Sequence, residues 1–503
     1  MVRNRLLLVL AALPLLACPR VEPDAAAYQI TERDQAVGGP AASATIGDFI
    51  LENGQIRAGV LDAHCRPSTQ GTGLTCFSPG PGVYGGSLAD IDLRRDDAAT
   101  SSGAGNDLFA ELFDSVNMEL MAAQEVAVLA DGSDGGPAIV RAQGPAGQYI
   151  TYIELIGDIM NLPRTWQITD YALRPGDRYV TMTTVAVFAE EDIEGNLVKP
   201  ADPCGWSVGD PGLPCDGLLL PPVTGKLPLI QGLNDGATTI GDFWLAGGDL
   251  DIFVPTIGFD EEIKANDEFL AGRNSAVDPF EFPYIAATGN GTSYAMGTGG
   301  DLSAPMFTSS LTAVFGVSYA PELDKENDPI QPPVGSAFGY RRWLGVGQGD
   351  AGTAYDALLD AFADNGYAQT VGTLTGRVVE ETTLEALSGV DVLVYRDTGA
   401  ALDSDGLPPD TDIFTHYATE PGMDRVDDGS FGGRLPVGDY LLVAKERGRP
   451  PTAPVSVTIP HPTLGEPTTF LITKLKLINN LRMQLYSVSG RTMVPLVIHQ
   501  AYR

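Results

Sequence analysis

Apolar and polar residues alternate with a period of two through much of the chain after residue 45. Residues 48–60 form two such stretches around Asn53-Gly54, a dipeptide strongly favoured in tight hairpin turns. Turn-forming Gly, Pro and Asp residues separate further alternating segments at 122–129, 138–142, 149–156, 165–171, 179–188, 249–254, 292–296 and 313–319. Strands this frequent predict a mainly β fold, with a large antiparallel β-sandwich over residues 45–368.

Two stretches show a helical spacing instead. The apolar residues Leu108, Leu112, Val116 and Leu120 lie four apart, which predicts a helix across residues 108–120. A second helix is predicted over residues 353–362, where Asn365-Gly366 supplies a stop signal. We therefore expect helices to interrupt the strands at these two places.

The segment before the second predicted helix matches the GxGxxG pattern of dinucleotide sites. It reads Gly347-Gln348-Gly349-Asp350-Ala351-Gly352, and Glu380 follows at a distance that suits a ribose contact. A dinucleotide site also needs alternating strands and helices around the pattern, whereas the next predicted strand opens a β-sandwich. We therefore interpret the pattern as a glycine-rich turn from a strand into a helix, and we predict no nucleotide site.

The chain begins with a short basic segment and an apolar run. Arg3 and Arg5 precede the run from Leu6 to Leu16, which is too short to span a membrane and is typical of a secretory signal. The run ends in Leu15-Leu16-Ala17-Cys18, which resembles the lipobox of bacterial lipoproteins. The resemblance implies a signal peptide over residues 1–18 and a lipidated Cys18. An ordinary signal peptide with a chance cysteine is the alternative.

The predicted lipoprotein signal indicates where the protein resides. The resemblance implies export to the cell envelope and attachment to a membrane by the lipid anchor alone. Pro19 is not the aspartate that commonly retains lipoproteins at the inner membrane, so the outer membrane is expected. Residues 19–44 are rich in Pro, Ala and Gly and carry no apolar period, which predicts a flexible linker.

Composition and charge narrow the choice of partners. The 503 residues are 44% hydrophobic and 19% charged, as in globular proteins, and their number suits two or three domains. The net charge is −34, and cleavage before Cys18 removes two arginines and no acid. So acidic a surface repels nucleic acid and anionic lipid headgroups, so neither is an expected partner.

Four cysteines remain after Cys18, and four allow three pairings. Cys65 and Cys76, like Cys204 and Cys215, are eleven positions apart and enclose loops rich in Gly and Pro. Short loops favour pairing within each local pair, so two disulfides are predicted. A zinc site is disfavoured because no Cys-x-x-Cys pair is present.

A second strand-rich region begins near Val371. Its segments are Thr373–Val379, Val390–Tyr395, Asp428-Gly429-Ser430-Phe431 and Leu435–Ala444. Over residues 371–459 these segments resemble the carboxypeptidase regulatory-like domain. That resemblance implies a small immunoglobulin- or transthyretin-like β-sandwich over residues 370–460, a module that is generally non-catalytic and adhesive or spacing.

Residues 45–365 carry a further resemblance. Its motifs are Gly47-Asp48-Phe49-x-Leu51-Glu52-Asn53, Thr169-Asp170-Tyr171-x-Leu173-x-Pro175-Gly176 and Arg341-Arg342-Trp343-Leu344 with Gly347-x-Gly349-Asp350. They resemble the N-terminal β super-sandwich of secreted metallohydrolases of the polymerase-and-histidinol-phosphatase type. In those proteins a catalytic domain follows, and it is absent from this sequence.

The last segment, residues 461–503, differs in charge from the rest. No acidic residue follows Glu466, whereas five basic residues do: Lys474, Lys476, Arg482, Arg491 and Arg503. One explanation is a basic strand that docks on the acidic body. The other is that residues 485–497 open a further, truncated domain, because one or two strands cannot bury a core alone.

An acidic loop in the second region is the one candidate metal site. Asp403-Ser404-Asp405-Gly406, followed by Asp410 and Asp412, resembles half of an EF-hand calcium loop, but Ala401 stands where the first ligand belongs. A solvated acidic loop explains the same residues. Calcium is therefore a weak expectation, and the sequence suggests no other cofactor.

Sequence motifs typical of hydrolases are not evident in the chain. The four histidines form no cluster, and no Gly-x-Ser-x-Gly elbow occurs. A glycosidase needs only two carboxylates, and a sugar site would also use an aromatic floor. The residues considered are Asp90, Asp92, Asp107, Glu111 and Asp114, with Trp166, Trp206, Trp244 and Trp343. Their spacing selects no pair, so surface acids and core aromatic residues are the simpler interpretation.

The sequence thus favours an exported, tethered lipoprotein that binds, spaces or scaffolds, with a glycan or another cell-envelope component as the expected ligand. Catalysis is not expected, although it stays open. The alternatives are a carbohydrate-active super-sandwich and the accessory half of a metallohydrolase.

Overall fold

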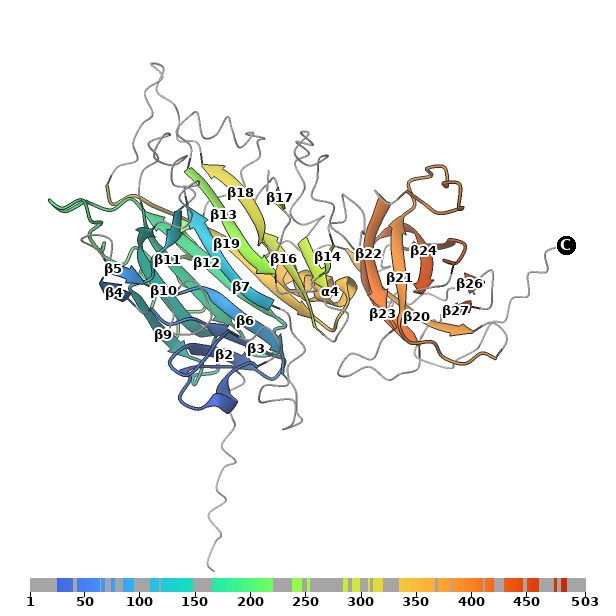
Figure 1. Cartoon of the computed structure of the whole chain (residues 1–503), viewed down its shortest axis with the longest axis horizontal. Helices are drawn as coiled ribbons and strands as arrows, with labels where there is room; N and C mark the ends of the chain where they lie inside the picture. The colour runs from blue at the N-terminus through green and yellow to red at the C-terminus, as the bar shows by residue number, and fades with distance from the viewer. Residues whose placement is uncertain are drawn as a thin grey trace, which may run out of the picture.

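The structure is a computed structural model, and it describes most of the predicted β regions. The described residues are 25–38, 43–63, 65–67, 74–76, 85–94, 109–116, 119–147, 165–219, 238–246, 251–253, 284–287, 292–298, 306–307, 311–319, 334–366, 370–380, 383–409, 412–419, 429–446, 450–460, 475–476 and 481–485. They form a mainly β, antiparallel fold, as the sequence predicts (Figure 1).

The large domain contains two antiparallel series of strands. In the first series the pairing order is β17, β18, β13, β7, β6, β3, β2, β1. The strands are β1 (Ala25–Gln29), β2 (Phe49–Asn53), β3 (Ile56–Val60), β6 (Leu88–Leu93), β7 (Phe109–Val116), β13 (Thr238–Ala246), β17 (Met306–Phe307) and β18 (Leu311–Tyr319). The hairpin of β2 and β3 turns at Asn53-Gly54, so this prediction is confirmed.

In the second series the order is β9, β10, β11, β12, β19, β16, β15, β14. The strands are β9 (Glu125–Asp131), β10 (Ala138–Gly147), β11 (Trp166–Leu173), β12 (Tyr179–Val187), β14 (Asp251–Phe253), β15 (Tyr284–Ala287), β16 (Ser293–Thr298) and β19 (Ala337–Gly347). Strand β8 (Glu119–Met121) pairs with both β7 and β10 and so joins the two series.

Smaller elements complete the large domain. They are the hairpin of β4 (Cys65–Pro67) and β5 (Leu74–Cys76) and the short 3-10 helices η1 (Arg33–Gln35) and η2 (Asp216–Leu218). Apolar residues from both series of strands meet in one buried cluster, to which Leu51, Leu112, Tyr171, Met182 and Leu344 contribute. This cluster is the core of a sandwich, and it defines the inner face of each layer.

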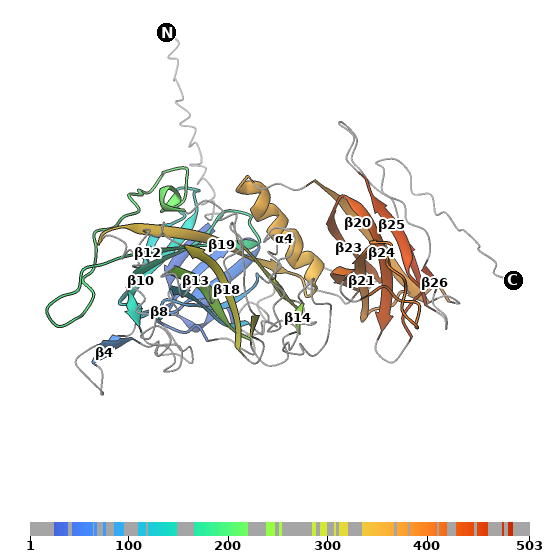
Figure 2. The ribbon, with the colours of Figure 1, turned by 90° about the horizontal axis from the view of Figure 1, so that it is seen from above.

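The helix α4 (Ala351–Asp364) follows β19 directly. The Asp350 side chain accepts a hydrogen bond from Thr353 N, which caps the first turn, and Asn365 ends the helix. Prediction and structure therefore agree on this helix and on its stop signal. It lies between the large domain and the second sandwich (Figure 2).

The second sandwich has two four-stranded antiparallel sheets. One has the order β23, β20, β27, β26 and the other β22, β21, β24, β25. The strands are β20 (Val371–Glu380), β21 (Val390–Arg396), β22 (Ile413–Ala418), β23 (Ser430–Pro436), β24 (Gly438–Glu446), β25 (Val455–Ile459), β26 (Leu475–Lys476) and β27 (Leu481–Leu485). Their buried residues form one cluster with α4, so the second sandwich and the helix share a core.

The helix predicted across residues 108–120 is wrong. Those residues form β7 and β8, and β7 pairs with β13 along most of its length. A spacing of four is also an even number, so Leu112 and Val116 fall on the same face of a strand as readily as on one face of a helix. Leu112, Val116 and Leu120 are all buried, and pairing on both edges of β7 decides for the strand.

The flexible linker predicted for residues 19–44 is also wrong from Ala25 onward, where the structure describes the chain. Strand β1 begins at Ala25 and pairs with β2 through five residue pairs, from Ala25 opposite Asn53 to Gln29 opposite Phe49. Ala25 and Ala27 are buried in the core, and η1 follows. Alanines looked like linker composition, but alternate small apolar residues suit a strand that closes one edge of the sheet.

The C-terminal segment does not begin a separate unit at residue 461. Strand β27 pairs with β20 from Gly376 opposite Leu485 to Glu380 opposite Leu481. It therefore belongs to the second sandwich, as the docking alternative expects, because β20 has a second edge to fill. Most of residues 485–497, where further strands were predicted, lies outside the described residues.

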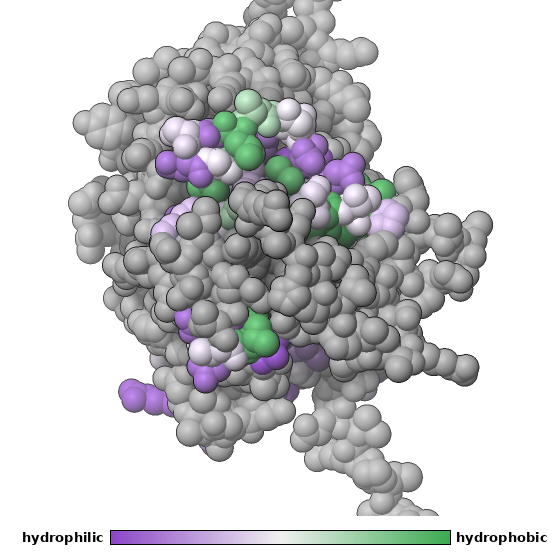
Figure 3. Space-filling view, turned by 90° about the vertical axis from the view of Figure 1, so that its right-hand side faces the viewer, coloured by the Kyte–Doolittle hydropathy of each residue, from purple (hydrophilic) through white to green (hydrophobic). Residues whose placement is uncertain are grey.

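The end of the molecule that carries the second sandwich is shown in Figure 3. Where residues are coloured on this face, hydrophobic side chains are interspersed with hydrophilic ones. Among the described residues, no helix has the length and apolar character needed to cross a bilayer.

Candidate functional site

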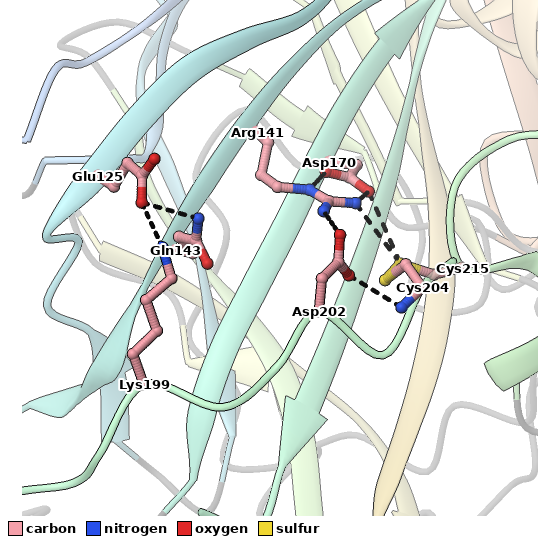
Figure 4. Close-up of polar contacts among 8 residues, drawn as sticks. All are labelled: Glu125, Arg141, Gln143, Asp170, Lys199, Asp202, Cys204 and Cys215. Atoms are coloured by element: carbon pink, nitrogen blue, oxygen red, sulfur yellow. Dashed lines mark hydrogen bonds and ion pairs between the residues drawn. A yellow bond between two sulfur atoms is a disulfide. The ribbon is translucent and has the colours of Figure 1, made fainter. Parts of the chain in front are cut away.

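The strongest charged constellation in the described structure lies on the outer face of β10 and β11. Arg141 on β10 stands directly opposite Asp170 on β11. Both side chains point away from the core between the layers, and both are buried, Asp170 with 2% of its side chain exposed. The segment that covers them follows β12 and contains Asp202, Cys204 and Cys215 (Figure 4).

Arg141 binds two carboxylates at once. Its Nε donates to Asp170 Oδ1 at 2.6 Å and its Nη2 to Asp170 Oδ2 at 2.7 Å, a two-pronged contact. Its Nη1 donates to Asp202 Oδ2 at 2.6 Å. Three of the five guanidinium N–H groups thus hold a strand of the sheet and the covering segment together.

Burial and charge act in opposite directions on this pair. Burial raises the pKa of Asp170, and the hydrogen bonds and positive charge of Arg141 oppose that rise. Burial works to lower the pKa of Arg141, but the hydrogen bonds and negative charges of Asp170 and Asp202 together outweigh it, so the pKa of Arg141 is raised. Arg141 therefore stays charged, and its charge is neutralised locally.

A disulfide closes the covering segment. Cys204 and Cys215 are bonded, with Cα atoms 4.3 Å apart, in the pairing that their spacing favours. Cys215 Sγ lies 3.7 Å from Asp170 Oδ2, so the disulfide sits on the buried ion pair. Asp170, Cys204 and Cys215 are also close enough to hold a metal, but both sulfurs are bonded to each other and Asp170 is bound by Arg141.

A second ion pair holds the same segment to the sheet, at strand β9. Lys199 Nζ lies 2.5 Å from Glu125 Oε2 on β9, and Gln143 on β10 donates to the same oxygen at 3.0 Å (Figure 4). Both partners of this ion pair are half exposed, so it contributes little energy. Arg341 also contacts Asp216 on η2. The whole arrangement anchors the segment after β12 onto the sheet rather than presenting a reactive group.

The sequence contains a signal for this cluster in the phase of two neighbouring strands. Ile139 and Arg141 share a strand phase, as do Ile168 and Asp170, so opposite charges fall at positions where a buried apolar residue is expected. Two such breaks in neighbouring strands indicate a buried ion pair. The register that brings them together is long-range and becomes visible only in the structure.

A second polar constellation joins α4 to the second sandwich. Asp356 Oδ1 accepts from Arg434 N at 2.7 Å, and Arg434 Nη1 donates to Asp360 Oδ1 at 2.6 Å. Asp350, the cap of α4, accepts from Ala418 N of β22 through its other oxygen at 3.1 Å. Burial raises the pKa of Asp356 to about 7, although the positive charge of Arg434 opposes the rise.

The glycines of the GxGxxG pattern serve this junction. Gly349 has a φ of +90°, which favours glycine. A Cβ atom at Gly352 would lie 2.0 Å from Tyr417 Cε1, so the start of α4 packs directly on a ring of the second sandwich. A Cβ atom at Gly347 would lie 2.3 Å from Ala354 N. The turn from a strand into a helix that the sequence predicts is the observed structure.

Of the other predicted sites, Cys18 lies outside the described residues. Cys65 and Cys76 stand directly opposite each other across β4 and β5, a register compatible with the predicted bond, although their side chains are not described. That second disulfide stays a prediction.

The acidic loop is described except for Asp410. Asp403 Oδ1 accepts from Asp405 N at 2.8 Å and from Leu407 N at 2.9 Å, and Asp412 Oδ2 accepts from Thr398 at 2.7 Å. In the part of the chain that the structure describes, Asp403, Asp405 and Asp412 do not form a metal-sized group. Loop closure by Asp403 accounts for these contacts.

Calcium binding at this loop can be tested by mass action. If the carboxylates bind calcium, millimolar calcium should raise the melting temperature, and Asp405→Ala should abolish the shift. The contacts of Asp403 favour the solvated loop, for which wild type and variant melt alike in calcium and in chelator. Differential scanning fluorimetry measures both, with Asp439→Ala as a control outside the loop.

Two of the acids considered for a sugar site have hydrogen-bond partners in the fold, and a third, Asp90, is fully buried. Asp92 accepts from Thr292 at 2.5 Å, and Glu111 accepts from Ser87 at 2.7 Å. Trp166 and Trp343 are buried, and Trp206 is half-buried and donates to Gly212 O. Asp107 and the side chains of Asp114 and Trp244 lie outside the described residues.

One polar feature lies on the inner face of the sandwich. Gln167, Thr169, Thr184 and Arg342 share the strand phase of the core residues and are at most 1% exposed; we call them the inner polar strip. Arg342 Nη1 donates to Thr184 Oγ1 at 2.8 Å, and the two hydroxyls of Thr169 and Thr184 are 2.9 Å apart. The inner face therefore carries a buried polar strip beside its apolar core.

Comparison with known proteins adds little to this geometry. No protein family and no curated protein matches the chain. Among solved structures, a galactose 1-epimerase from Lactobacillus acidophilus NCFM is similar at a TM-score of 0.26 and 9% identity, over 65% of this chain and 100% of that one. A putative aldose 1-epimerase from Escherichia coli K12 gives 0.20 and 11%, over 44% and 69%. At these scores neither likeness carries an argument.

Proposed function

We propose that the protein is an exported lipoprotein, tethered through Cys18, whose two β domains act together as a rigid binding and spacing unit without turnover. The observation that carries this proposal is the junction at α4. One face of the helix packs on the large domain, and the other on the second sandwich. A spacer must hold its ends at a fixed separation, and a shared core does so.

Three polar contacts support the same rigidity. Arg434 binds Asp356 and Asp360 on α4, and Ala418 N binds the cap residue Asp350. The ring of Tyr417 lies against Gly352, where no side chain could fit. These contacts come from different strands, so rotation of one domain against the other would break several of them together.

The buried acids support binding or spacing over catalysis. Asp170, Asp92, Glu111 and Asp350 each accept hydrogen bonds that fasten one segment of the fold to another. A catalytic carboxylate must instead be free to exchange a proton with a substrate. These four carboxylates are thus committed to structure.

The inner polar strip favours one alternative, a carbohydrate-active super-sandwich. Hydroxyl and guanidinium groups on a sheet are chemistry that suits a polyhydroxylated ligand. On the facing series, Asp114 and Asp242 are opposite each other in register. Incubation with polysaccharides separates the two functions: retention of glycan without new reducing ends favours binding, and release of reducing ends favours the alternative.

The tether is tested by metabolic labelling with palmitate. The wild type should be cleaved before Cys18 and labelled, whereas Cys18→Ala should remain an unlabelled precursor, because the modified thiol must become the mature N-terminus. The control replaces both Cys204 and Cys215 by alanine, which leaves the labelled cysteine intact. Equal labelling of Cys18→Ala and wild type would refute the lipoprotein assignment.

A further inference from the structure

The described part of the chain begins at Ala25, which is held in the fold. Ala25 is fully buried, opens β1 and pairs with Asn53 on β2. Its carbonyl oxygen lies so close to Gly132 that a Cβ atom there would be 2.2 Å away. The position of Ala25 relative to the large domain is therefore set by the core.

Only a short stretch separates this fixed point from the proposed lipid anchor. Cys18 and Ala25 are seven residues apart in sequence. Each residue of a fully extended chain spans at most about 3.3–3.6 Å, so Ala25 lies within about 25 Å of Cys18 whatever path the chain takes. A tether that began to fold at residue 45 would have allowed a much longer reach.

We propose that the end of the large domain at which β1 begins faces the membrane and lies against its headgroups. This inference rests on the proposed lipidation of Cys18. We call this end the proximal end. It consists of the turns after β2, β9 and β11, at residues 53–55, 132–136 and 174–178.

Hydrogen bonds hold the proximal turns together as one surface. Asn53 Nδ2 donates to Arg174 O and to Asp177 O, both at 2.8 Å. Arg94 N donates to Gln55 O at 2.7 Å, and Gly132 lies against Ala25. The turn after β2 belongs to the first series of strands, and the turns after β9 and β11 belong to the second. The surface therefore spans both layers of the sandwich.

The charge of the proximal end differs from that of the whole chain. In the sequence, 65 acids face 31 lysines and arginines. The described proximal turns themselves contain two arginines, Arg174 and Arg178, and two acids, Asp134 and Asp177. Burial also raises the pKa of Asp177 to about 6. A locally balanced end can approach an anionic headgroup layer with less repulsion than the acidic remainder.

The opposite end of the strands faces away from the membrane. Strand β12 runs from Tyr179, next to the proximal end, to Val187, and at about 3.3 Å per residue it covers about 26 Å. Beyond Val187 the chain forms a hairpin through the bridge of Glu191 with Leu197, and Ile193 at its tip is fully exposed. This hairpin lies at the end of the strands opposite the proximal end.

Fluorescence quenching at the membrane tests the orientation. A cysteine replaces Gly54 in the proximal turn, where a Cβ atom would meet nothing within 4 Å, or Ile193 in the distal hairpin. Each full-length, lipidated variant is labelled with a fluorophore and reconstituted into vesicles whose headgroups carry a nitroxide quencher. Quenching should be several-fold stronger for the label at Gly54→Cys than for the label at Ile193→Cys.

A control and two contrary outcomes complete the test. A long Gly/Ser insertion between Pro23 and Asp24 should remove most of the difference between the two labels. An acylated protein in which both labels are quenched equally, or the distal label more strongly, would overturn the orientation alone. A mature protein without acyl chains would overturn the proposed tether and, with it, this inference.

Discussion

Arg141→Met is expected to lower the free energy of unfolding by about 3–5 kcal/mol, because it leaves a buried carboxylate without its positive partner. Asp170 is fully buried and takes two hydrogen bonds from the guanidinium. Methionine keeps much of the packed volume but donates nothing. Urea unfolding followed by tryptophan fluorescence measures the loss, since Trp166 and Trp343 are buried.

Two further variants separate the buried charge from ordinary packing. The double variant Arg141→Met with Asp170→Leu should regain most of the lost stability, since an apolar pair of similar volume leaves no charge in the interior. Asp202→Asn should cost at most about 1 kcal/mol, because 53% of the Asp202 side chain is exposed. A loss for Arg141→Met no larger than that for Asp202→Asn would contradict the assignment of the buried pair.

The parts of the fold that the sequence predicts well are set by local signals. Asn53-Gly54 specifies a tight hairpin, and the strands on each side of it follow. Asp350 and Asn365 bracket α4 through capping interactions with nearby residues. The strands β20, β21, β23 and β24 follow from alternation and turn residues within each segment. In each case neighbours in sequence supply the physical cause.

The parts that it misses depend on distant partners. A spacing of four fits a helix or a strand, and only the pairing of β7 with β6 and β13 decides. Ala25 and Ala27 become a strand because β2 offers an edge more than twenty residues away. The ion pair of Arg141 and Asp170, the main charged cluster found here, depends on a register between two strands that local patterning does not fix.

Stability should rise as the pH falls through neutrality, because of Asp356. The pKa of this carboxyl is about 7 in the fold and 3.8 as the ordinary value, and burial is the main cause. Between these values the folded state binds a proton that the unfolded state does not, so lowering the pH favours folding. From about pH 7.5 to pH 5.5 the gain should be about 2 kcal/mol.

Other charged groups also contribute to the change of stability with pH. Arg434 and Arg178 favour its charged form, whereas Asp350 disfavours it. Asp177 has a pKa of about 6 with the same sign of effect, but it is partly exposed, so its contribution is smaller. The net charge of −34 also makes the whole protein more stable as acids become neutral. The total slope is therefore not specific to Asp356.

Asp356→Asn isolates the contribution of this one carboxyl. Asparagine retains an oxygen that can accept from Arg434 N, but it does not titrate. The unfolding free energy of the variant should therefore change less with pH than that of the wild type, by about 2 kcal/mol across the same interval. Urea unfolding at matched pH values measures both curves. Parallel curves would mean that Asp356 already has its ordinary pKa in the fold, and that the contact between α4 and β23 keeps its carboxylate charged at neutral pH.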